Sequence, residues 1–193
     1  AMQGLPVDLV EWQADAYAHA ETPRLSRMLF DLRTALGERM PLLFTYRTQA
    51  EGGAGEASLD GYRRINLLAL ASGQADLLDV ELNRGDALAR EMAGAIHAAG
   101  RRMLLSQHDF RATPAETSMV ETLRRMEAFG ADIRKVAYMP QQKEDVHALL
   151  NACAKAAQAQ ASPICAISMG RLGVLSRIAC GVYGAALTFG NAV

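Results

Sequence analysis

The chain has 193 residues, of which 50% are hydrophobic, so it can form one domain with a substantial core, which we place at residues 1–193. The formal net charge is −1, which predicts no nucleic-acid partner, and no apolar run is long enough to cross a membrane. The N-terminal segment is not a secretory signal and the three cysteines lack CxxC spacing, so we expect free thiols and a cytoplasmic location.

Short apolar segments alternate with longer segments of helical period along the whole chain. Each apolar segment is nearly continuous in character, as is typical of parallel strands that are covered on both faces. The expected strands are residues 7–12, 41–47, 75–82, 101–108, 133–140, 163–169 and 185–189.

The intervals between these strands predict helices. In residues 24–36, leucine and methionine recur at steps of three and four. Thr113 and Pro114 predict an N-cap and a first helical residue, followed by a helix that ends near Phe129. Further helices are expected in residues 56–72, 86–98 and 142–159. Glycines stand where three helices should stop, at Gly37, Gly100 and Gly130.

This alternation implies an α/β fold with a parallel sheet. Seven expected strands fit either a doubly wound sheet or a (β/α)8 TIM barrel, which needs eight strands and usually about 250 residues. If the fold is a barrel, the chain lacks a first strand and a final helix.

Binding and catalytic groups of parallel α/β folds gather at the carboxyl ends of the strands. Polar or sulfur-containing side chains occupy these positions in most of the expected strands and in the segments that follow them. They are Glu11, Arg47, Glu51, Asp79, Glu81, Ser106, His108, Asp109, Lys135, Ser168, Met169, Ser176 and Arg177.

Lys135 lies inside an apolar segment, in phase with Ala137 and Met139. Burial generally disfavours the charged form of a lysine, and a neutral amine attacks a ketone to form a Schiff base. The alternative is a structural lysine whose side chain extends to solvent.

His108 shares a face with Leu104 and Ser106 at a spacing of two residues. At a strand end, a histidine is suited to general acid–base catalysis near neutral pH, and the alternative is a histidine that bonds a loop carbonyl. Glu51 lies in the glycine-rich sequence EGGAGE, which predicts either a mobile functional loop or a plain surface turn. The histidines lack metal-ligand spacing, so we expect no metal.

Six segments, taken in their order and spacing, match the pattern of a known family. They are DLVEWQAD at 8–15, PLLFTYRTQAEGG at 41–53, DLLDVEL at 76–82, LLSQHDFRATP at 104–114, ADIRKVAYMPQ at 131–141 and SMGRLGVLSRIACGVYGAALTFG at 168–190. Together they resemble the type I 3-dehydroquinate dehydratases over nearly the whole chain. The resemblance implies a TIM barrel that dehydrates 3-dehydroquinate to 3-dehydroshikimate, without metal or organic cofactor and as a homodimer.

The resemblance also implies a role for each site residue. Lys135 would form the Schiff base, His108 would act as general acid and base, and Glu51 would assist His108. The residues that would bind substrate are Glu11, Gln13, Arg47, Met169 and Arg177, with Arg177 on the carboxylate. Asp79 and Glu81 would position these groups from the floor of the barrel.

Three features depart from the family pattern. The family usually has arginine where this chain has Gln13, so a positive charge is lost. The family's first strand, and its substrate-covering loop with the final helix, have no counterpart here, so we expect a fragment or the ordered part of a longer chain.

Two other functions compete with the dehydratase. A class I aldolase-like barrel would use the same lysine chemistry to cleave a C–C bond, and a homologue without catalytic activity would keep the motifs but not turn over. The sequence leaves open whether a dehydratase would serve aromatic biosynthesis or quinate breakdown.

Overall fold

A computed structural model describes residues 7–159 and 162–190 of the chain. In this part of the chain six parallel strands form one sheet, and each strand pairs with the next one in chain order. The strands are β1 (Val10–Gln13), β2 (Leu42–Thr45), β3 (Leu77–Glu81), β4 (Arg102–Asp109), β5 (Ile133–Tyr138) and β6 (Ile164–Ser168).

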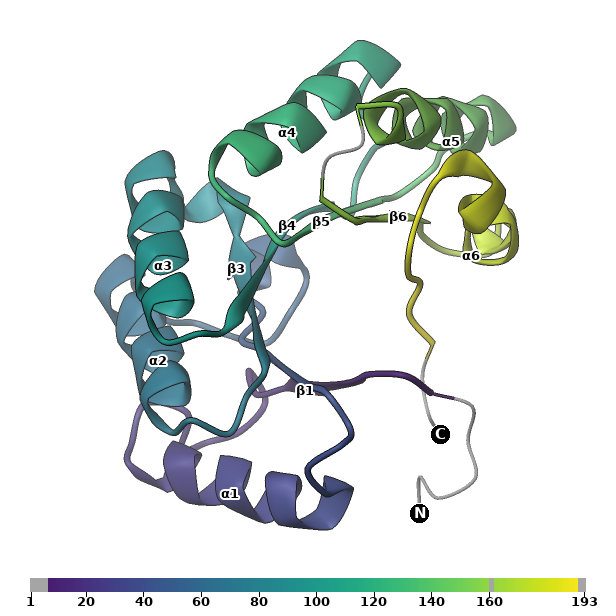
Figure 1. Ribbon diagram of the computed structural model, residues 1–193. Coiled ribbons are helices and arrows are strands. Elements are labelled where there is room, and N and C mark those ends of the chain that lie inside the picture. The colour runs from purple at the N-terminus through teal and green to yellow at the C-terminus, as the bar shows by residue number, and fades with distance from the viewer. Residues whose placement is uncertain (1–6, 160–161, 191–193) are drawn as a thin grey trace.

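Helices cover the outer side of this sheet, which curls around an open interior (Figure 1). They are α1 (Arg24–Leu36), α2 (Leu59–Ala71), α3 (Asp86–Ala98), α4 (Glu116–Ala128), α5 (Lys143–Ala157) and the short α6 (Val174–Ala179). Short 3-10 turns lie at η1 (Gln49–Glu51), η2 (Leu82–Arg84) and η3 (Cys180–Tyr183). The regular strand–helix alternation therefore places the first five helices around one curled sheet.

The main hydrophobic core lies between the sheet and these helices. In β3, Leu78 and Val80 belong to this core, whereas Asp79 and Glu81 point to the opposite, concave face and contact Arg47. Successive side chains of a strand point to opposite faces, so every second residue is available to the concave side. The concave face is where the polar residues of the strands gather.

The seventh expected strand, residues 185–189, is not a strand in the structure. A single backbone hydrogen bond joins it to β6, from Ala186 N–H to the Ile164 carbonyl at 2.8 Å. One bond does not make a ladder, and Leu187 and Phe189 instead pack against apolar residues of β5 and β6. Within the described residues the sheet is therefore open, with β1 and β6 as its edge strands.

The expected start of the fourth helix is also wrong. The helix begins at Glu116 with Ala115 as its N-cap, and the Thr113 hydroxyl has no hydrogen-bond partner among the described residues. The Asp109 carboxylate accepts the N–H groups of Arg111 and Ala112, which holds the chain after β4 in a turn. The expected helix ends are confirmed, because the glycines there have positive φ angles: Gly37 at 77°, Gly100 at 69° and Gly130 at 82°.

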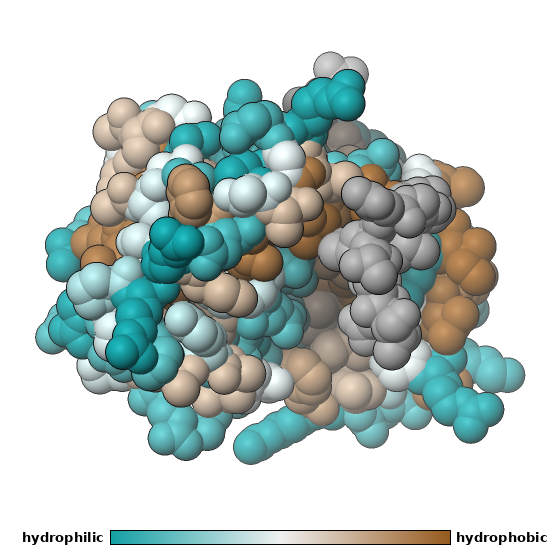
Figure 2. Space-filling model, turned by 90° about the horizontal axis from the view of Figure 1, so that it is seen from below, coloured by the Kyte–Doolittle hydropathy of each residue, from teal (hydrophilic) through white to brown (hydrophobic). Residues whose placement is uncertain are grey.

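Large apolar side chains are exposed on and around α6 and η3. Ile178 is 80% exposed and Val182 is 89% exposed. Figure 2 shows this apolar area in brown at the side of the molecule that carries α6. The three cysteines are free, as the sequence predicts, and the structure shows that all three are buried. None of the described helices has both the length and the apolar character needed to cross a membrane.

Candidate active site

Lys135 is buried on the concave face, in the middle of β5, and is only 5% exposed. Its Nζ lies 3.6 Å from Glu11 Oε1 and 3.8 Å from Asp79 Oδ2. The Phe189 ring packs over the amine, with its centroid 4.1 Å from Nζ. Lys135 therefore faces the interior of the curled sheet, and the alternative of a lysine that extends to solvent is excluded.

Arg47 organises the acidic residues next to this lysine. Its Nη2 lies 2.5 Å from Asp79 Oδ2, and its Nη1 lies 3.3 Å from Glu81 Oε1 and 3.4 Å from Glu51 Oε2. Arg47 itself is buried, with 4% exposed. One guanidinium thus holds three buried carboxylates together.

Hydroxyl groups fix the orientation of the carboxylates. Thr45 Oγ1 donates to Glu11 Oε1 at 2.7 Å. Thr48 donates to Glu81 twice, through its N–H at 2.8 Å and its hydroxyl at 2.7 Å. Neither threonine is among the residues predicted from the sequence, although Thr45 lies two residues before Arg47, and this spacing could have indicated a shared face.

His108 and Glu51 form a hydrogen-bonded pair at the carboxyl ends of β4 and β2. His108 Nδ1 lies 2.8 Å from Glu51 Oε2, and the His108 backbone N–H donates to the same oxygen at 3.1 Å. No described residue hydrogen-bonds to His108 Nε2, so this nitrogen is available to a bound molecule. The alternative of a histidine that bonds a loop carbonyl does not fit these contacts.

The glycine after Glu51 lets the loop hold this carboxylate in place. Glu51 ends η1 and is 1% exposed, so it does not lie in a plain surface turn. Gly52 has φ 83°, and a Cβ there would approach the Phe110 ring to 2.2 Å. Phe110 follows β4 closely, so the contact joins the loop that carries Glu51 to the segment that carries His108.

Burial and charge perturb the protonation of the pair. Burial and the neighbouring carboxylate of Glu81 raise the pKa of Glu51 to about 8, although Arg47 opposes this shift. Burial, with the positive charges of Arg47 and Lys135, lowers the pKa of His108 well below its usual value. Burial would also raise the pKa of Asp79, but Arg47 and Lys135 outweigh it and that pKa is lowered. The site therefore favours an ionised Asp79 and a neutral imidazole.

These shifts predict a pH-dependent effect of Glu51→Gln on stability. Because the pKa of Glu51 in the folded chain is raised to about 8, its contribution is full below the unfolded pKa and is lost as pH rises through about 8. Glutamine does not titrate. Between the unfolded pKa of Glu51 and pH 8, the free energy of unfolding of the variant should therefore rise relative to that of the parent, by up to about 1.4 kcal/mol per pH unit. Urea unfolding of both proteins at pH 5 and pH 8 measures the change, and an equal difference at the two pH values contradicts it.

The other predicted substrate residues surround this centre at different depths. Gln13 is exposed at the carboxyl end of β1, two residues beyond Glu11. Met169 is buried directly after β6 and packs in the same apolar cluster as Phe189. Arg177 is exposed on α6 and donates from Nη1 to the Phe189 carbonyl at 2.5 Å. Phe189 thus contacts both Arg177 and Lys135, while Gln13 lies exposed at the end of its strand.

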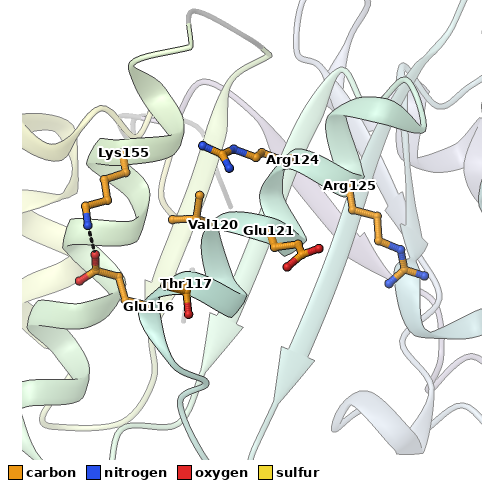
Figure 3. A pocket seen from close by; sticks show the side chains of 7 residues that line it. All are labelled: Glu116, Thr117, Val120, Glu121, Arg124, Arg125 and Lys155. Carbon is orange, nitrogen blue, oxygen red and sulfur yellow. Dashed lines mark hydrogen bonds and ion pairs between the residues drawn. The ribbon is translucent and has the colours of Figure 1, made fainter.

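A separate surface hollow lies on the outer helix layer, away from these residues (Figure 3). Its wall contains the exposed ion pair between Lys155 and Glu116. The lining residues are Glu116, Thr117, Val120, Glu121, Arg124, Arg125 and Lys155. It contains none of the predicted site residues. Among the described residues there is also no group of three histidine, cysteine or acidic side chains placed to hold a metal ion.

The chain is an α/β protein whose six parallel strands form a curled half-barrel, with charged groups gathered near the carboxyl ends of the strands. Comparison with known proteins gives the family. The profile of the family described as Type I 3-dehydroquinase matches residues 1–193, and the chain belongs to this family.

Individual relatives agree with this assignment. The chain is 41% identical over 191 residues to a 3-dehydroquinate dehydratase of Syntrophotalea carbinolica, covering 98% of this chain and 75% of the relative. It is 40% identical over 186 residues to one of Klebsiella pneumoniae, covering 95% and 74%. Relatives of this name are hydro-lyases, and the resemblance inferred from the sequence is confirmed.

Solved structures show the same fold. A crystal structure of a type I 3-dehydroquinate dehydratase from Clostridium difficile, described with covalently modified comenic acid, matches with a TM-score of 0.94 and 37% identity. The match covers 98% of this chain and 75% of that one. The 3-dehydroquinate dehydratase of Enterococcus faecalis matches with a TM-score of 0.93 and 38% identity, covering 97% and 79%.

Proposed function

We propose that this chain removes water from 3-dehydroquinate to give 3-dehydroshikimate, through a Schiff base on Lys135. The observation that carries the proposal is the buried amine of Lys135 on the same concave face as the His108–Glu51 pair. Family membership supports it, because the relatives are named for this reaction. We further propose that the curled sheet is part of a (β/α)8 barrel.

The first step is attack of the Lys135 amine, after loss of its extra proton, on the ketone of the substrate. Loss of water then gives an imine, and a proton returned to its nitrogen makes the iminium ion. The carboxylates of Glu11 and Asp79, within 4 Å of Nζ, stabilise the positive charge that the iminium carries. The iminium withdraws electrons from the neighbouring carbon and makes its proton more acidic. The site therefore prepares the substrate for proton removal without a metal.

His108 then transfers the proton. It lies on β4, two residues beyond Ser106, the register partner of Lys135, so the two side chains start roughly 8 Å apart. The substrate would lie between them. The reactive form of the pair has an ionised Glu51 and a neutral His108. In this form Nε2 of His108 takes the proton, and Glu51 stabilises the resulting imidazolium through its hydrogen bond to Nδ1. The same proton then goes to the leaving hydroxyl, and hydrolysis of the product imine frees Lys135.

Substrate binding is assigned to the residues around this pair. Arg177 would bind the carboxylate, Glu11 and Gln13 would bind hydroxyls, and Met169 would contact the ring. Arg47 would also bind a substrate hydroxyl; two of the bonds of its Nη1, to Glu51 at 3.4 Å and Glu81 at 3.3 Å, are long, while its bond to Ser106 is 2.9 Å. The homodimer and the cytoplasmic location remain predictions.

The test is conversion of 3-dehydroquinate, followed by the absorbance of the conjugated enone of 3-dehydroshikimate. We expect turnover without added metal or organic cofactor. An aldolase-like enzyme would give no enone, and the comparisons do not favour that alternative. A folded protein that produces no enone would support the homologue without catalytic activity.

Gln13→Arg is expected to lower the KM for 3-dehydroquinate by about 5-fold to 10-fold, because a charge-assisted hydrogen bond exceeds a neutral one by roughly 1 kcal/mol. Gln13 is exposed, so an arginine there does not have to be buried. Steady-state kinetics measure the change. Gln158→Arg adds the same charge at the end of α5 and should leave KM unaltered. An unchanged or higher KM in Gln13→Arg contradicts the placement of Gln13 beside the substrate.

A further inference from the structure

Ser106 is a buried hydroxyl at the centre of the concave face, and the mechanism above does not use it. It lies on β4, in register with Glu81 on β3 and with Lys135 on β5. It is 0% exposed. A buried hydroxyl keeps its position only if its hydrogen bonds are made, so its partners indicate what it does.

The hydrogen bonds of Ser106 have a defined direction. Arg47 Nη1 lies 2.9 Å from Ser106 Oγ, and a guanidinium can only donate. The hydroxyl has one proton of its own, which therefore goes to Asp79 Oδ1 at 2.6 Å. Ser106 thus accepts from the cation and donates to the carboxylate.

The two carboxylate oxygens of Asp79 therefore have different partners. Oδ1 is held by Ser106, so the carboxylate cannot rotate freely about its bond to Cβ. Oδ2 then faces Arg47 Nη2 at 2.5 Å and Lys135 Nζ at 3.8 Å. The Asp79 oxygen that faces the reactive amine is therefore the one that Ser106 does not occupy.

We propose that Ser106 is a positioning residue that acts on Lys135 through Asp79: its hydroxyl holds the carboxylate so that Oδ2 faces the iminium formed at Nζ. The inference rests on the proposed Schiff-base function and adds a residue to it. Without the hydroxyl, Asp79 loses a charge-assisted hydrogen bond and its fixed orientation, and the iminium loses part of its stabilisation.

The test compares Ser106→Ala with a matched control, Ser168→Ala. Ser168 is a buried serine at the end of β6 whose Oγ has no partner among the described residues, so its removal tests hydroxyl loss alone. We expect Ser106→Ala to lower kcat and the rate of borohydride-trapped adduct formation at saturating 3-dehydroquinate by about 10-fold or more, with a much smaller change in KM. Ser168→Ala should keep both rates.

A second comparison separates positioning from a general loss of structure. In an Asp79→Asn background, Ser106→Ala should cause little further loss, because the charge on which it acts is already gone. A full additional loss there would overturn the action through Asp79. If Ser106→Ala does not fold, Ser106→Cys has a similar shape with a much weaker donor and is expected to show the same loss.

The outcomes distinguish this inference from the proposed function. If the parent chain forms no borohydride adduct with 3-dehydroquinate, the Schiff-base function fails and the role of Ser106 fails with it. If the parent forms the adduct and Ser106→Ala forms it as fast as Ser168→Ala, only the role of Ser106 is overturned.

Discussion

Lys135→Ala is expected to abolish turnover of 3-dehydroquinate and also to abolish the covalent adduct that borohydride traps. The physical reason is position: among the described residues, Lys135 is the lysine that lies on the concave face, while Lys143 and Lys155 are exposed on α5. No other lysine in the described part of the chain is placed to attack the ketone. Enone absorbance and intact mass after borohydride treatment measure the two losses.

Two controls belong with this variant. Lys143→Ala removes an exposed lysine and should keep turnover and trapping. Lys135→Met keeps an apolar side chain of similar length, so the concave face stays filled. This variant should also lose turnover and trapping, which shows that the loss does not come from misfolding. A folded Lys135→Ala protein that gains the adduct mass, or that turns over at the parent rate, contradicts the mechanism.

His108→Ala is expected to reduce turnover by about 10²-fold to 10⁴-fold, the usual range for general acid–base catalysis, while it still forms the imine. The amine that attacks is untouched in this variant, so the adduct should remain trappable. It can even accumulate, because hydrolysis of the product imine also needs a proton-transfer group. Turnover and adduct mass, measured on the same sample, separate the two steps.

His147→Ala, in the exposed part of α5, is the matched control and should turn over normally. The assignment fails if His108→Ala retains more than about one tenth of parent turnover. It also fails if the variant loses the adduct completely, since His108 would then be needed before the covalent step.

Much of the fold follows from local sequence patterns. The six strands could be predicted from short, nearly continuous apolar segments and the long helices from their helical period, and Gly37 ends α1 where its position predicts. The expected strand at residues 185–189 shows the limit of this reasoning. Its composition fits a strand, but pairing depends on neighbours that a local pattern does not contain, and Phe189 instead packs over Lys135.

Part of the site could also be predicted from the sequence. The alternation of side chains along each strand placed Lys135 and His108 on defined strand faces, and the resemblance to the family supplied their roles. The network around Arg47 could not be predicted, because it joins residues from η1, β3 and β4 that lie far apart in the chain. The hydroxyls that hold the carboxylates are short side chains on neighbouring strands, and the pairing and register of these strands, which a local pattern does not contain, bring them into contact.

The most direct test of the Schiff-base mechanism is mass spectrometry of the parent chain treated with 3-dehydroquinate and borohydride, followed by peptide mapping. The mechanism predicts one reduced adduct per chain, on the peptide that contains Lys135, and none when borohydride is added without substrate. An adduct on a peptide without Lys135, or no adduct in a chain that produces the enone, would contradict it.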